Sequence, residues 1–335
     1  MKSAVFTKED HWKFFPEFVK LEIASGGPDP QIPLVAEMSK DCSEAEKIWR
    51  AGCYICVYNV PFAEILWQNI SWERVLTMDV IDIHKWLSDN WKGIITRVER
   101  RSVRKPEWMA QFLLEYRNWA LSVLPEARKL FYGRLIYENY LNIWDSCQNV
   151  KYLGRYVALK LLEFYKTHLG FPIKEPDIRP KGGWSPRTTL ADLYPEYATP
   201  LLGGESAQEL HIVNTTVAQL KNDLREKFNL TPTLFQLQVL LCEYRESYSS
   251  QKQYPGRSHD SELGYWNKAQ AHWKHKSEMF AARKRIFPEF HLGELYGWNG
   301  ARAELGKNLA THRYTWSDLL YDYSKTTDFA NPWRR

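Results

Sequence analysis

Apolar residues recur along most of the chain at intervals of three and four, the spacing that places them on one face of a helix. Helix-start signals agree: Thr7 precedes the first apolar run, Ser43 stands three residues before Glu46, and Asn59 and Pro61 open the next run. These signals predict helices from Thr7 to about 26, over 43–58 and from Pro61 onward. The pattern predicts further helices over residues 79–92, 107–122, 126–147, 151–168, 206–227, 232–249, 261–285 and 299–310.

Two stretches interrupt the helical pattern. Residues 170–205 are rich in proline and glycine, and residues 248–260 form a second break. A structureless connection as long as the first is uncommon unless it is functional. We therefore expect a mostly α fold with an N-terminal lobe, 1–170, and a C-terminal lobe, 171–335, or one integrated domain. Only residues 94–96 resemble a strand.

Composition narrows the class of protein. The 335 residues are 44% hydrophobic, 25% charged and 15% aromatic, and they carry a net charge of +5. That charge permits nucleic-acid partners without demanding them. No apolar run approaches the roughly 20 residues that span a bilayer, and five cysteines do not form a disulfide framework. We expect a cytoplasmic protein without a membrane partner.

Candidate cofactor-binding and metal-binding motifs lack the residues or the spacing that such sites require. Residues 300–308 place five residues between two glycines and lack the hydroxyl of a phosphate-binding loop. Cys53 and Cys56 have no second cysteine pair, and His272 and His275 are three apart on a predicted basic helix, so buried thiols and a solvated helix face are the favoured interpretations. The sequence therefore predicts no cofactor and no metal.

A basic segment is the first candidate for phosphate binding. If residues 97–104 are helical, four arginines share one face and present guanidinium groups to phosphates. A solvated surface face is the equally open alternative. The four residues are Arg97, Arg100, Arg101 and Arg104.

A second candidate is a helical hairpin. Gly154 and Arg155 open an apolar helix shortly after the predicted end of another near Cys147, the layout of a helix–hairpin–helix. In such a hairpin the amides at the start of the second helix bind a DNA phosphate. Most have two glycines, and here Tyr152 stands at the first position, so an ordinary turn between helices is also open.

Three short motifs follow one another along the chain, over residues 153–156, 182–187 and 241–245. Together they resemble the alpha-glutamyl/putrescinyl thymine pyrophosphorylases, which bacterial viruses use as amino acid:DNA transferases. The resemblance covers roughly residues 40–330. It implies a fold related to helix–hairpin–helix DNA glycosylases and a location in the host cytoplasm of an infected bacterium.

The resemblance also implies a reaction and its partners. A 5-hydroxymethyluracil DNA kinase pyrophosphorylates 5-hydroxymethyl-deoxyuridine in double-stranded DNA. A free amino acid or other amine then displaces pyrophosphate at the 5-methylene of that base. No cofactor is implied.

This reaction needs groups of four kinds, and each has candidates. A carboxylate must accept a proton from the amine, with Glu243 first, then Asp260 and Asp177. Cations must stabilise the pyrophosphate: Lys181, Arg187, Arg245 and Arg257. Aromatic rings must stack on an extruded base: Tyr152, Tyr156, Trp184 and Tyr244. The DNA backbone is assigned to Gly154, Arg155 and the four arginines of the basic segment.

Two alternatives stay open at this point. A DNA glycosylase of the same fold carries an essential Asp some 20 residues after the hairpin glycine, and Asp177 lies 23 residues after Gly154. That displacement and the missing first glycine argue against glycosylase chemistry. A non-catalytic helical DNA-binding protein, whose aromatic residues merely fill the core, is the other alternative.

Overall fold

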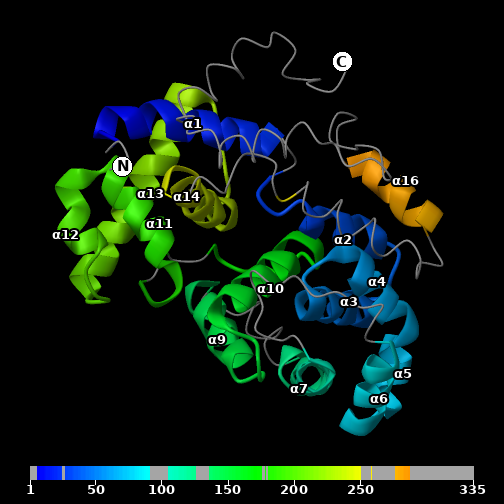
Figure 1. Ribbon diagram of the computed structural model, residues 1–335. Helices are drawn as coiled ribbons and strands as arrows, with labels where there is room; N and C mark the ends of the chain where they lie inside the picture. The colour runs from blue at the N-terminus through cyan, green and yellow to red at the C-terminus, as the bar shows by residue number, and fades with distance from the viewer. Residues whose placement is uncertain are drawn as a thin grey trace. The chain divides into compact units, whose positions relative to one another are not determined.

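The computed structural model is built from helices in two compact units (Figure 1). It describes residues 6–24, 27–90, 105–125, 136–175, 178, 180–249, 258 and 276–286. Within these ranges every regular element is a helix, which confirms the mostly α prediction. The predicted strand at 94–96 and the helix at 299–310 lie outside the described residues.

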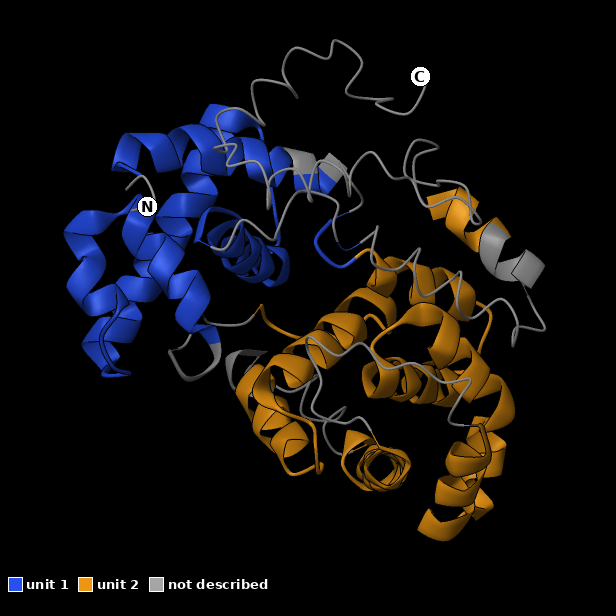
Figure 2. Ribbon diagram, in the orientation of Figure 1, with its two compact units in different colours: residues 1–29, 176–260, 288–335 blue, residues 30–175, 261–287 orange. Residues whose placement is uncertain are grey.

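Figure 2 colours the two units. Unit 1 comprises residues 1–29, 176–260 and 288–335, and unit 2 comprises residues 30–175 and 261–287. Each unit is thus assembled from separate parts of the chain. The lobes expected from sequence meet at residue 170, whereas the chain passes between units after residues 29, 175, 260 and 287.

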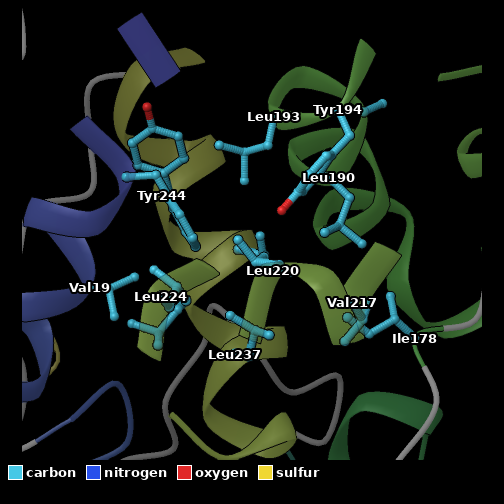
Figure 3. Close-up of a cluster of buried hydrophobic side chains, with 14 of the residues drawn as sticks. Val19, Ile178, Leu190, Leu193, Tyr194, Val217, Leu220, Leu224, Leu237 and Tyr244 are labelled. Atoms are coloured by element: carbon cyan, nitrogen blue, oxygen red, sulfur yellow. The ribbon is translucent and has the colours of Figure 1, made fainter. Parts of the chain in front are cut away.

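Unit 1 packs its helices around one apolar core. Its elements are α1 (Lys8–Ala24), α11 (Pro180–Leu193), the 3₁₀ turn η2 (Pro195–Tyr197), α12 (Ala198–Leu201), α13 (Ala207–Phe228) and α14 (Leu234–Ser249). Leu220 and Leu224 of α13 meet Leu237 and Tyr244 of α14 within this core (Figure 3). Since Leu237, Leu240, Leu241 and Tyr244 are all buried, α14 is a core element.

Unit 2 surrounds a helix that is buried along most of its length. Its helices are α2 (Gln31–Ser39), α3 (Glu44–Val57), α4 (Val60–Asn69), α5 (Trp72–Thr77), α6 (Val80–Asn90), α7 (Pro106–Ser122), α9 (Ile136–Gln148), α10 (Arg155–His168) and α16 (Lys276–Ile286). Every residue from 48 to 57 on α3 is buried. A Cβ atom on Gly52 would lie 2.2 Å from the Tyr116 ring, so only glycine allows α7 to approach α3 this closely.

The predicted helix starts at Ser43 and Asn59 are confirmed. The Ser43 hydroxyl accepts the Glu46 amide, and the Glu46 carboxylate accepts the Ser43 amide, which completes a capping box. Asn59 caps α4 by accepting the Phe62 amide. These local signals worked because each uses hydrogen bonds within three residues.

The prediction that residues 170–205 are irregular was wrong for most of residues 180–201, which are helical. Residues 180–193 form α11, whose backbone departs from helical geometry at Gly183 and then resumes. This restart places Pro186 in a first helical turn, where its missing N–H is not needed. Leu190 and Leu193 then reach the core of unit 1, and their burial stabilises the helix.

His168 at the end of α10 makes the stability of unit 2 depend on pH. Burial lowers the pKa of His168 to about 4, against a partial opposing effect of a hydrogen bond with the Ile32 backbone. In the unfolded chain the His168 ring binds a proton near pH 6.5, whereas in the folded state it stays neutral down to about pH 4. The free energy of unfolding should therefore fall by about 3 kcal/mol as the pH drops from about 6.5 to 4.

Urea denaturation at several pH values measures this effect. The His168→Gln variant should lose less stability than the wild type over that interval, whereas His84→Gln, at an exposed position on α6, should behave like the wild type. Equal pH dependence in wild type and His168→Gln would contradict the assignment.

Candidate functional site

The helices α11 and α14 form the most extensive helix-to-helix contact in unit 1. The Thr189 hydroxyl donates a hydrogen bond to the Leu241 carbonyl at 2.8 Å, and the Tyr248 hydroxyl donates to the Asp192 carboxylate. Polar contacts thus join the second half of α11 to α14.

Two motifs singled out in the sequence meet in this helix pair. Nη1 of Arg245 on α14 donates a hydrogen bond to Oγ of Ser185 on α11 at 3.1 Å. Because long side chains on a helix point back toward its N-terminus, the Arg245 guanidinium lies nearer the start of α14 than the Arg245 Cα atom does. The indole of Trp184, the residue before Ser185, is 52% exposed. A guanidinium, a hydroxyl and an exposed aromatic ring thus come from one short segment and its partner helix.

A polar network continues along the same helix pair. Burial raises the pKa of the Tyr248 hydroxyl, and its hydrogen bond to Asp192 raises it further, so Tyr248 stays protonated and donates. His11 of α1 lies 3.1 Å from the Tyr244 hydroxyl through Nδ1. Burial lowers the pKa of His11, which favours the neutral ring there. Asp192 is thus the half-buried carboxylate of this network.

Arg187, predicted to bind pyrophosphate, is committed to the backbone. Its side chain is 0% exposed, and its guanidinium donates to the carbonyl oxygens of Leu201, Pro200 (2.9 Å) and Gly204 (3.3 Å). The carbonyls of Pro200 and Leu201 lie in the last turn of α12, and that of Gly204 lies just beyond it. We therefore leave Arg187 out of the proposed binding site.

Replacing Arg187 by Met should lower the free energy of unfolding by about 2–3 kcal/mol, because buried carbonyls lose their donors. Urea denaturation measures the loss. The matched control is Arg225→Met at a largely exposed position on α13, which should change stability little. A stable Arg187→Met protein that had lost affinity for pyrophosphate would instead return Arg187 to the site.

Glu243 and Tyr244 occupy other faces of α14. Glu243 is two residues before Arg245, and such positions point to different sides of a helix. Glu243 is also buried, with only 2% of the residue exposed. The Tyr244 ring lies in the core of unit 1, with its centroid 5.2 Å from that of Phe15, so it presents no free face for a base.

The predicted hairpin corresponds to α9, α10 and the turn between them. Gly154 caps α10 in extended conformation, and a Cβ atom placed on it would meet nothing within 4 Å. Tyr152 has φ of 66°, a left-handed conformation that glycine adopts more easily. Position 154 therefore has room for a side chain, and the residue in the place of the first glycine adopts a glycine-like backbone.

Aromatic and basic side chains of the hairpin already have neighbours within unit 2. The Tyr152 ring stacks on Trp108 with centroids 5.9 Å apart, and the Tyr156 hydroxyl accepts a hydrogen bond from Tyr58 at 3.4 Å. The Arg155 guanidinium lies 5.9 Å from the Trp144 ring. Of the four predicted stacking residues, Trp184 has by far the most accessible ring.

Other predicted site residues cannot be placed. Lys181 lies on α11, but its side chain is outside the described part of the structure. Outside the described residues altogether are Asp177, Arg257, Asp260, Arg97, Arg100, Arg101 and Arg104.

Three polar residues of the helix pair were missed as candidates by the sequence analysis. They are Ser185 and Asp192 on α11 and Gln238 on α14. Ser185, Thr189 and Asp192 follow a helical spacing of four and three, which places them on one face. That signal was present but was hidden by the irregular prediction for this segment.

No group of three or more potential ligands for a metal ion occurs among the described residues. None of the helices in that part of the chain is long and apolar enough to cross a bilayer. Comparison with protein-family models, curated proteins and solved structures finds no match to the chain.

Proposed function

We propose that this chain is a DNA-modifying transferase. It joins an amino acid or another amine to the 5-methylene of pyrophosphorylated 5-hydroxymethyl-deoxyuridine in DNA and releases pyrophosphate. The observation that carries the proposal is the 3.1 Å hydrogen bond between Arg245 and Ser185. It joins two of the three motifs on which the sequence resemblance rests, although they lie 60 residues apart.

The proposed chemistry is a substitution at carbon. The amine nitrogen forms a bond to the methylene carbon while the bond from that carbon to the pyrophosphate oxygen breaks, and the oxygen keeps the electron pair. Arg245 stabilises the negative charge that develops on the leaving group. A carboxylate takes the proton from the attacking nitrogen, and Glu243 is our first assignment. Trp184 offers its exposed ring to the extruded base.

In this proposal DNA-backbone binding belongs to unit 2. The first turn of α10, which follows Gly154, directs the positive end of a helix dipole toward one phosphate. Arg155 adds a cation in the same turn. We also propose that the helical fold is of the helix–hairpin–helix DNA-glycosylase type.

A single assay tests the function. The protein is incubated with an amino-acid mixture and duplex DNA that contains 5-pyrophosphomethyl-uracil, and the digested nucleosides are analysed by mass spectrometry. We expect an amino-acid adduct of the nucleoside together with free pyrophosphate. Release of free base with abasic sites would favour a glycosylase. Binding to DNA that stays unchanged would favour a non-catalytic DNA-binding protein.

A further inference from the structure

Gln238 is a buried amide with an acceptor that has no hydrogen-bond partner. The residue is 8% exposed, and its Oε1 accepts no hydrogen bond from any described residue. Its Nε2 lies 4.0 Å from the position that a Cβ atom would take on Gly183. Leaving a buried polar atom unpaired lowers the stability of the folded state, so such an atom in a native protein calls for an explanation.

The neighbourhood of Gln238 has the features of a ligand site. Gly183 is where the backbone of α11 departs from helical geometry before the helix resumes. The exposed ring of Trp184 follows Gly183 directly. Arg245 lies seven residues after Gln238 on α14, about 10 Å farther along the helix, and its guanidinium turns back to Ser185.

The chemistry of an amide restricts what can bind. A side-chain amide offers one acceptor and two donors side by side, so it pairs with a planar group that presents a donor next to an acceptor. A phosphate alone leaves Oε1 unpaired, because a fully ionised phosphate has no donor. The imide edge of a uracil-type base has an N3–H donor beside a carbonyl acceptor and fits both positions.

We propose that Gln238 recognises the N3–H and an adjacent carbonyl of the target pyrimidine, at a subsite beside Gly183 on the α11–α14 helix pair. This inference rests on the proposed function, and it names the residue that selects the base. Trp184 provides a stacking surface next to the subsite. The Arg245 guanidinium supplies the positive charge that stabilises the pyrophosphate group carried by the base. Gln238 is thus a specificity-determining residue.

Binding to short single strands tests the inference without any catalytic step. One oligonucleotide carries a central thymine and the other carries N3-methylthymine, which has lost the donor. We expect the wild-type protein to bind the N3-methylated strand about tenfold more weakly, by fluorescence anisotropy. Gln238→Met keeps the size of the side chain and should bind both strands equally. Gln208→Met, at an exposed position on α13, should keep the wild-type preference.

Each outcome decides the matter. Equal binding of both strands by the wild-type protein overturns the inference without reference to any variant. So does a Gln238→Met protein that retains the preference. Thermal denaturation checks the fold of Gln238→Met, whose stability should be equal or higher because an unpaired acceptor is gone. Loss of the preference in Gln238→Met but no transfer in the mass-spectrometric assay would keep the subsite and reject the transferase.

Discussion

Replacing Glu243 by Gln should lower the rate of amine transfer by about a hundredfold or more and leave the affinity for DNA unchanged. The substitution keeps the shape of the side chain but removes the group that accepts a proton from the amine. General bases contribute roughly 10²- to 10⁴-fold to a rate, so the loss falls on turnover and not on binding. Single-turnover kinetics and fluorescence anisotropy on the same DNA separate the two quantities.

Two further variants make this test decisive. Glu246→Gln removes an exposed carboxylate three residues farther along α14 and should transfer at the wild-type rate. Asp192→Asn removes the carboxylate that accepts the Tyr248 hydroxyl and that lies on the same face of α11 as Ser185. If Glu243→Gln is fully active and Asp192→Asn is not, the proton acceptor is Asp192. In that case Glu243 contributes to the packing of unit 1 and takes no part in the reaction.

Local hydrogen bonding made part of this structure predictable. Ser43 and Asn59 start helices through hydrogen bonds with residues three positions away, so the sequence alone shows them. α11 was missed because proline and glycine suggest a loop. Its helix depends on the kink at Gly183 and on burial against α14, which is distant in the sequence. Propensity is a weak predictor wherever such tertiary packing decides.

The candidate site divides in the same way. Arg245 and Trp184 were recognisable as residue types that bind anions and stack on bases. The role of Arg187 was not, because only the fold brings the carbonyls of 200–204 to its guanidinium. Gln238 was also missed, since its unpaired oxygen is a property of burial. A sequence shows which groups are present, whereas their remaining hydrogen-bonding capacity depends on the folded structure.

Breaking the buried ion pair between Arg50 and Glu64 should lower the free energy of unfolding by about 3–5 kcal/mol. Arg50 of α3 contacts Glu64 of α4, and their side chains are 5% and 2% exposed. The guanidinium also donates to the Met38 carbonyl at 2.5 Å and lies 3.9 Å from the Trp67 ring. Glu64→Leu leaves a buried cation without this counter-charge, which is why the loss is large.

A double-mutant cycle separates the ion pair from the packing around it. Arg50→Met combined with Glu64→Leu removes both charges and should cost much less than the sum of the single losses, as seen by urea denaturation. Arg285→Met breaks a more exposed pair with Glu37, 2.7 Å apart, and should cost less than about 1 kcal/mol. Additive losses in the cycle would show that the two charges do not stabilise each other. In that case the cation–π contact with Trp67 and the Met38 carbonyl would be the main partners of Arg50.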